Sequence, residues 1–396
     1  METTPKWELE ERNLRLQRRM APSGLDAVFI VQNADLFYFT GTVQEGLLFI
    51  GCEGPPLFLV RRSYERAVAE SALEHIQSFQ SLKEAADLVK GHGLRHLKRV
   101  GLELDVLPVI QYQRLERVFP GIEFVDASPI IRQVRAVKSP YEIGLMREAA
   151  DICDIMACHL REIVKEGMTE LELAADIEAE ARRSGHQGFV RFRRFNHESF
   201  YGHLLAGESG AIPAYIDAST GGSGPSPAFG QGAGNRRIQA YEPILLDYPG
   251  AYKGYLADQS RLFALRGLPD DLVRAYDVTL EIYNEILQRI RPGARSDDIY
   301  KAAVALAEKL GYQEFFMNYG AAQVSYIGHG VGTEIDEFPF LARGFEMTLE
   351  EGMTIAIEPK LVFPGRGVIG IEDTILINRE GCESLTFSDR ELGILC

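Results

Sequence analysis

The chain has 396 residues, of which 46% are apolar, and this size and composition predict two folded domains, each with its own core. Its 42 Lys and Arg residues stand against 57 Asp and Glu residues and give a formal net charge of -15. That sign is wrong for a protein that binds nucleic acid through its phosphate backbone, so we expect no nucleic-acid partner.

The five cysteines are odd in number, scattered and without C-x-x-C spacing, so we expect neither a disulfide framework nor a thiolate zinc site. The first residues, METTPKWELEERNLRLQRR, lack the apolar run of a secretory signal, and no later stretch approaches about 18 consecutive apolar residues. These features predict a cytoplasmic protein with no membrane partner.

Residues 1 to 135 read as an α/β domain. Short apolar runs such as DAVFIV, GLLFIG, PLFLV, RVGLEL and IEFVDA alternate with amphipathic stretches such as SYERAVAESALEHI. Alternation of this kind predicts strands and helices in layers. Nothing in this part of the chain suggests catalysis.

A second domain, residues 136 to 396, is predicted to start with a helix. Ser139, Pro140 and Glu142 match an N-cap, a first-turn proline and an N3 glutamate. Just before them, the basic residues Arg132, Arg135 and Lys138 predict a solvated linker, with domain docking as the alternative.

The second domain contains an internal repeat at an offset of 126 residues. A segment ending at Gly185 matches one ending at Gly311, and Gly167 in the first copy aligns with Gly293 in the second. Each copy reads as two helices broken at that glycine, followed by strand-like segments: FVRFRRF after the first, and GMTIAIEP and GIEDTILI after the second. We expect two related lobes around a shared cleft.

Two acidic pairs fall on predicted hairpins. Asp247 and Asp258 are symmetric about residues 252 and 253, and Glu358 and Glu372 are symmetric about residue 365. Each pair would therefore face each other across two strands. Like charges so placed destabilise a sheet unless a cation lies between them.

A metal would supply that cation. Either pair alone also fits the solvent face of an ordinary hairpin, but two pairs of the same symmetry favour a metal site. His329, in GHGVG, adds a nitrogen donor, and we expect its glycine neighbours to permit a metal to approach closely. Four carboxylates and one imidazole suit two divalent ions of the Mn, Co, Fe or Zn type.

Taken together, these residues resemble the creatinase, aminopeptidase P and prolidase family of pita-bread metallopeptidases, over nearly the whole chain. The resemblance implies an α+β fold: an N-terminal creatinase-like α/β domain, then a pita-bread domain with a pseudo-two-fold repeat and a curved antiparallel sheet. It also implies two metal ions, a small-peptide substrate and a homodimer. The family's ligands fall on Asp247, Asp258, His329, Glu358 and Glu372. By this resemblance Asp258 and Glu372 bridge the two ions, Asp247 completes one, and His329 with Glu358 complete the other.

Two positions depart from the family pattern. The family usually carries a second histidine seven residues after the first, where this chain has Asp336. Family peptidases also place a histidine upstream of the first metal aspartate, where this chain has Ala228 and Phe229. His203 could substitute, although a lone histidine is more often structural.

The leading hypothesis is a metal-dependent hydrolase in which a hydroxide bridging two ions attacks an amide or related carbon–nitrogen bond. Glu358 would relay the proton, and Asp336 and His203 would contact the substrate. Small Xaa-Pro peptides are the substrate that the resemblance implies. The alternatives are a hydrolase or lyase of small non-peptide metabolites, and a metal-binding protein without peptidase activity.

Overall fold

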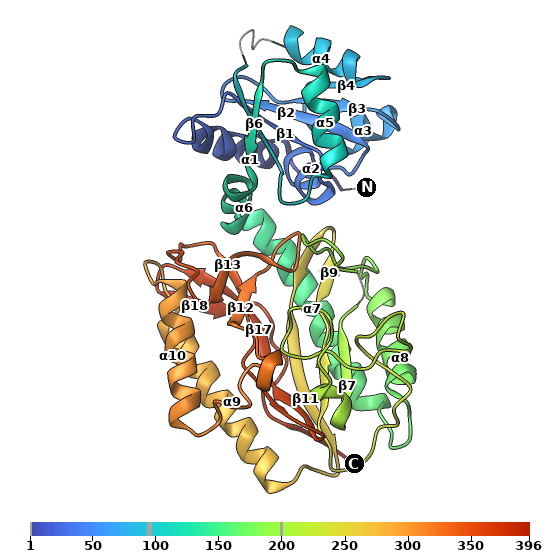
Figure 1. Ribbon diagram of the computed structural model, residues 1–396. Coiled ribbons are helices and arrows are strands. Elements are labelled where there is room, and N and C mark those ends of the chain that lie inside the picture. Colours follow the sequence, from blue (N-terminus) through green and yellow to red (C-terminus); the bar gives the residue numbers. More distant parts are fainter. Residues whose placement is uncertain (1, 93–96, 199–200) are drawn as a thin grey trace. The chain divides into compact units, whose positions relative to one another are not determined.

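The computed structural model describes residues 2–92, 97–198 and 201–396 (Figure 1). The chain forms two compact units, Met1–Arg135 with Arg193–Asn196, and Ala136–Phe192 with His197–Cys396. Within the described ranges, no helix is both long enough and apolar enough to cross a bilayer.

The first unit is built on a six-stranded mixed sheet. Its strands are β1 (Ala27–Ile30), β2 (Gly46–Gly51), β3 (Leu57–Val60), β4 (Ile76–Ser78), β5 (Arg99–Leu102) and β6 (Glu123–Asp126), in the order β4-β3-β2-β1-β5-β6. β2 pairs antiparallel with both β1 and β3. β4 pairs in parallel with β3, β5 with β1, and β6 with β5. Five of these strands fall on the apolar runs quoted above, and β4 is an addition.

Helices cover both faces of this sheet. They are α1 (Lys6–Met20), α2 (Asn33–Thr40), α3 (Tyr64–Glu70), α4 (Leu82–Gly91), α5 (Val109–Val118) and α6 (Ser128–Ala136). Alternate residues of β1 face opposite sides of the sheet and belong to two different hydrophobic cores. Val28 and Ile30 pack with α1, α2 and α6, and Ala27 and Phe29 pack with α4 and α5. Two-residue alternation in a strand covered on both sides explains why its sequence is apolar throughout.

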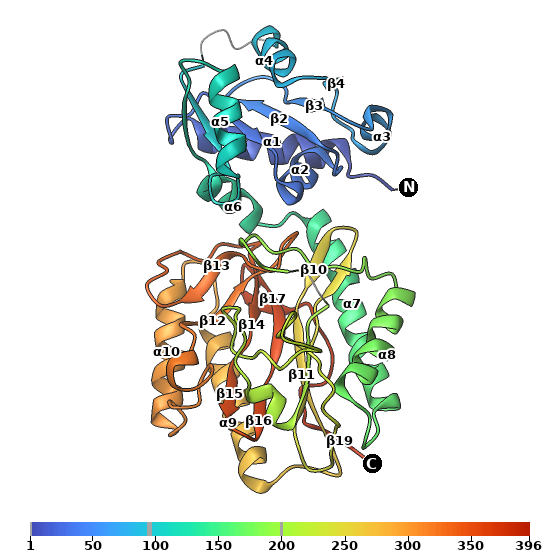
Figure 2. The ribbon, with the colours of Figure 1, turned by 45° about the vertical axis from the view of Figure 1, so that its right-hand side comes forward.

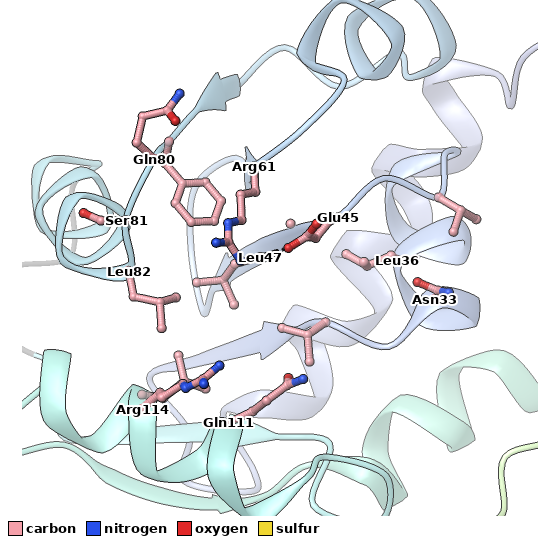
Figure 3. A pocket seen from close by; sticks show the side chains of 15 residues that line it. Asn33, Leu36, Glu45, Leu47, Arg61, Gln80, Ser81, Leu82, Gln111 and Arg114 are labelled. Carbon is pink, nitrogen blue, oxygen red and sulfur yellow. Dashed lines mark hydrogen bonds and ion pairs between the residues drawn. The ribbon is translucent and has the colours of Figure 1, made fainter.

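A pocket of about 530 Å³ opens in the first unit (Figure 3). Side chains from α2, β2 and α5 line it, among them Leu36, Leu47 and Arg114. An exposed ion pair, Arg61 to Glu45 at 3.0 Å, lies at the same pocket. The predicted site residues all belong to the other unit.

Two helix pairs flank the sheet of the second unit, as the repeat predicts. α7 (Pro140–Ile163) and α8 (Glu170–Arg183) form one pair, and α9 (Asp270–Arg289) and α10 (Ser296–Lys309) form the other. Gly167 and Gly293 lie between the helices of each pair with φ of 90° and 87°, a backbone region that glycine enters without steric cost. Figures 1 and 2 show the pairs on opposite flanks of the sheet.

The predicted start of α7 is confirmed. Ser139 is its N-cap, and its hydroxyl accepts from the Glu142 backbone N–H at 3.2 Å. The Glu142 carboxylate accepts in return from the Ser139 N–H at 2.9 Å, and Pro140 occupies the first turn. This reciprocal capping satisfies backbone donors that a helix leaves open at its start.

The second unit's main sheet is antiparallel apart from one terminal strand. Its order is β13-β12-β14-β17-β11-β8-β7, with β18 beside β17 and β19 parallel to β11. The strands are β7 (His203–Ala206), β8 (Ile244–Asp247), β11 (Gln259–Leu265), β12 (Tyr326–Gly330), β13 (Glu337–Ala342), β14 (Thr354–Ile357), β17 (Glu372–Asn378), β18 (Gly381–Ser384) and β19 (Gly393–Leu395). Two hairpins extend from it, β9 (Gly250–Tyr252) with β10 (Tyr255–Ala257), and β15 (Lys360–Phe363) with β16 (Gly367–Gly370).

Two expectations about the chain between elements are wrong. Residues 189–195, predicted as a strand, are irregular, and Arg193 instead forms ion pairs with Asp35 and Asp105, each at 2.7 Å. The basic linker is not solvated at Arg135 or Lys138. Both are buried, Arg135 against Asp35 and Lys138 against Glu337 at 3.0 Å, because each finds a buried carboxylate within its own unit.

Candidate metal centre

The five predicted metal ligands lie on neighbouring strands of the second unit's sheet. Asp247 ends β8, Asp258 immediately precedes β11, His329 lies in β12, Glu358 immediately follows β14 and Glu372 begins β17. In the sheet order, β12, β14, β17, β11 and β8 are consecutive. Residues 125 positions apart in sequence are thus brought together by strand pairing alone.

The register of the second acidic hairpin is as predicted. Lys360 pairs with Gly370 in β15 and β16, and Ile357 pairs with Asp373 in β14 and β17. These two pairs have the same register, and Glu358 and Glu372 lie between them, so the two glutamates are opposite each other. The prediction of opposed acids is confirmed for this hairpin.

The register of the first acidic hairpin differs from the prediction. Asp247 pairs with Ser260, so Asp258 is displaced by two residues from the expected position. The cause is the turn: Lys253 and Gly254 connect the paired residues Tyr252 and Tyr255, with φ of 44° and 91°. Positive φ at both central residues is the geometry of a two-residue hairpin turn, and the turn's position fixes the register.

Three of the predicted ligands present donor atoms close enough to share one ion. Those of Asp258, His329 and Glu372 all lie within 4.8 Å of one another. His329 Nε2 is 4.0 Å from Asp258 Oδ2 and 3.5 Å from Glu358 Oε1. Its Nδ1 lies 3.2 Å from the Gly330 carbonyl, which can only accept, so that hydrogen bond leaves the Nε2 lone pair for a metal. Carboxylates with an imidazole fit a divalent ion.

The glycines around His329 have a packing role that the sequence did not reveal. A Cβ on Gly328 would lie 2.4 Å from the Ala356 carbonyl oxygen, and one on Gly330 would lie 2.1 Å from the Phe338 carbonyl oxygen. Glycine is therefore required because neighbouring strands approach the backbone of β12 closely. The expectation that they also let a metal approach His329 stays a prediction.

Burial disfavours the ionised form of the carboxylates at this site. Desolvation, together with the charge of Asp247, raises the pKa of Asp258 to about 7. Desolvation, followed by the charge of Asp258, also raises the pKa of Glu372 well above its usual range. Buried carboxylates this close need cations to remain ionised.

One such cation is a residue that the sequence analysis did not single out, Lys360. Its Nζ lies 3.1 Å from Asp247 Oδ2, 2.8 Å from Glu358 Oε2 and 3.1 Å from Glu372 Oε2. Burial acts to lower the pKa of Lys360, but these three carboxylates outweigh it and raise the pKa well above the usual range. The signal was spacing: Lys360 is two residues after Glu358, and residues two apart in an extended chain point to the same side.

Other polar groups around the ligands were also missed. Ser260 donates to Glu372 Oε2 at 2.7 Å, and the Thr374 hydroxyl accepts from the Asp258 N–H at 2.7 Å. Next to Glu372, the buried Asp373 accepts from Arg261 at 2.6 Å. Hydrogen-bonded neighbours of this kind orient metal ligands.

The residues predicted to contact substrate lie in different settings. His203 is buried in β7 directly opposite Asp247. Burial lowers the pKa of His203, while Asp247 acts in the opposite direction and Lys360 adds to the lowering. Asp336 is partly exposed in the turn before β13, and its contact with substrate stays a prediction. Ala228 and Phe229 lie in a loop closed by a bridge between Ser226 and Phe229.

The repeated helix pairs, the curled antiparallel sheet and the cluster of acids with one histidine define a metal-dependent hydrolase of the pita-bread fold. The chain belongs to metallopeptidase family M24, whose family model matches residues 144–379. The model of the creatinase/prolidase N-terminal domain matches residues 12–137. The resemblance inferred from the motifs, and the α+β fold that it implies, are confirmed.

Similar proteins align along nearly the whole chain. An Xaa-Pro dipeptidase from Pyrococcus horikoshii is 27% identical over 386 residues, which are 97% of this chain and 99% of the relative. One from Lactobacillus delbrueckii subsp. lactis is 26% identical and covers 96% of this chain and 98% of its own. The structure of an Xaa-Pro dipeptidase from Bacillus anthracis superposes with a TM-score of 0.84 at 26% identity, covering 98% of this chain and 100% of that chain.

Proposed function

We propose that this metallohydrolase is a dipeptidase that cleaves small peptides, with Xaa-Pro dipeptides as the first substrate class to test. The similar dipeptidases support the peptide substrate, since they align from end to end with this chain. The observation that carries the proposal is the set of donor atoms on Asp258, His329 and Glu372, all within 4.8 Å of one another.

A divalent ion held by these residues would supply a nucleophilic water at neutral pH and a Lewis acid for the scissile carbonyl. The chain's own groups would do the rest. Glu358 Oε1 lies 3.5 Å from His329 Nε2, beside the donor cluster. In this proposal its carboxylate takes a proton from the attacking water and returns it to the leaving nitrogen. His203 is buried with a lowered pKa, so its neutral imidazole can donate a hydrogen bond to the developing oxyanion.

A second function has one specific observation in its favour. Asp336 stands where the resembling family carries a histidine, and Ala228 and Phe229 stand where it carries another. The absence of these imidazoles favours a hydrolase or a lyase that acts on a carbon–nitrogen bond of a small non-peptide metabolite. A carboxylate at Asp336 would repel acidic substrate groups and favour neutral or cationic ones.

The test is a substrate panel with matched variants. Xaa-Pro dipeptides, Xaa-Pro tripeptides, other dipeptides, and amide and guanidino metabolites are each incubated with Mn, Co or Zn. We expect metal-dependent release of proline that is lost in His329→Ala and retained in His159→Ala, a partly exposed histidine of α7. Turnover confined to non-peptide compounds would select the second function. Bound metal without any turnover would indicate a binding protein.

The finer predictions concern ion number, assembly and location. Five ligands predict two ions with a bridging hydroxide, but Lys360 contacts three of those ligands directly. A homodimer, implied by the family resemblance, and a cytoplasmic location, inferred from the cysteines and the N-terminal sequence, stay predictions. Gel filtration and cell fractionation would test them.

A further inference from the structure

Lys360 lies where a cation shared by three carboxylates would lie. Its Nζ is 3.1 Å from Asp247, 2.8 Å from Glu358 and 3.1 Å from Glu372. An ammonium has three N–H donors, and three acceptors are in place for them. These acceptors belong to three of the five residues predicted to hold two metal ions.

Packing keeps the lysine in this position. Its side chain is 2% exposed. Lys360 pairs with Gly370 across β15 and β16, and a Cβ on Gly370 would lie 2.5 Å from Lys360 Cγ. Glycine on the facing strand therefore makes room for the aliphatic part of the side chain. Packing against Gly370 holds the aliphatic part of the side chain, and ion pairs hold its ammonium.

A metal ion and this ammonium compete for the same oxygens. Carboxylate oxygens bind divalent ions at about 2.0–2.2 Å, which is shorter than the ammonium contacts described above. The predicted ion held by Asp247 with the bridging residues Asp258 and Glu372 would therefore need two of the three carboxylates that Nζ contacts. The two cations would also repel each other strongly in a buried site.

The remaining donors still form a site for one ion. Asp258, His329 and Glu372 each offer one donor atom, and these atoms lie within 4.8 Å of one another. We infer that Lys360 replaces one of the two predicted ions, so that the chain holds one divalent ion beside a permanent ammonium. The inference rests on the proposed function in one respect, that the cluster binds metal.

The replacement gives Lys360 a positioning role. Its contact at 2.8 Å fixes the Glu358 carboxylate, the group proposed above to transfer the proton. Unlike a bound ion, the lysine cannot leave the site, because it is a covalent part of the chain. Metal saturation should accordingly follow a single binding step.

Counting the bound ions tests the inference without using activity. The full chain is stripped with a chelator, dialysed against excess Mn²⁺ and analysed by elemental analysis and by electron paramagnetic resonance. We expect one ion per wild-type chain, with the spectrum of an isolated ion. Lys360→Ala should rise to two ions with a spin-coupled spectrum, because Asp247 and Glu358 lose their cation. Lys301→Ala, which removes a surface lysine 2.7 Å from Asp297, should stay at one.

Each outcome decides the matter. Two ions in the wild type, or one ion in folded Lys360→Ala, would overturn the replacement and leave the proposed function intact. No ion in the wild type would overturn both. If Lys360→Ala does not fold, the wild-type ion count and spectrum still distinguish one ion from a coupled pair.

Discussion

The stability of the second unit should depend strongly on Asp373, a buried carboxylate beside Glu372. It is 0% exposed and accepts four hydrogen bonds. These come from Arg261 at 2.6 Å, Tyr283 at 2.8 Å, Thr386 at 2.6 Å and Arg390 at 2.7 Å. Two of the donors are guanidinium groups, so the carboxylate is the charge partner of both.

Asp373→Asn keeps the side-chain shape and removes the charge. Arg261 is 2% exposed and would retain only carbonyl acceptors, such as Ser260 at 2.8 Å and Glu372 at 2.7 Å. The new amide N–H₂ would also face donors where the carboxylate accepted. Removing one partner of a buried ion pair costs about 3–5 kcal/mol, and we expect a loss of the free energy of unfolding in that range.

Urea unfolding followed by far-ultraviolet circular dichroism measures the loss, because the sheet and helices of the second unit dominate the signal. The matched control is Asp271→Asn, the same chemical change in an exposed ion pair with Arg366. Its midpoint should stay close to that of the wild type, since exposed pairs contribute little. Equal midpoints for the two variants would refute the reasoning.

Three further predictions concern pH, substrate and metal. Burial lowers the pKa of His186 to about 4 from 6.5, and its Nδ1 accepts from the Gly188 N–H at 2.9 Å. Because the unfolded state binds the proton more tightly, stability should be complete above pH 6.5 and fall by about 3 kcal/mol as the pH drops towards 4, a slope that His186→Gln should reduce. Asp336→His should raise kcat/KM for Xaa-Pro dipeptides, and no rise at all would show that this position does not set specificity. Transfer from Mn²⁺ at one hundred times its Kd to chelator should lower the free energy of unfolding by about 2.7 kcal/mol, with no such response in His329→Ala; an equal response in both would place the metal elsewhere.

Local signals in the sequence were sufficient for much of the fold. The capping residues at Ser139 and Glu142 act within one helical turn, so their neighbours in sequence determine the outcome. The helix pairs broken at Gly167 and Gly293 follow from a repeated apolar period. The register of the second acidic hairpin followed from symmetry about its turn.

Two other features, the register of the first acidic hairpin and the irregular path of residues 189–195, could not be predicted from local sequence signals. The position of the Lys253–Gly254 turn shifted Asp247 to a pairing with Ser260, because one hairpin register differs from another by small differences in turn geometry. Residues 189–195 alternate like a strand, but Arg193 forms ion pairs with the buried Asp35 and the exposed Asp105 instead of lying beside a neighbouring strand. Local pattern does not reveal such distant partners.

The sequence by itself determined the chemical kind of the site: four carboxylates and one imidazole, on segments whose periodicity made them strands. Only the tertiary structure decided which of them lie close enough together to share one ion, and that Lys360 lies among them. The physical reason is range. Residue type and period act over a few residues, whereas the competition between an ammonium and a metal for the same buried oxygens depends on strand order and packing across the sheet.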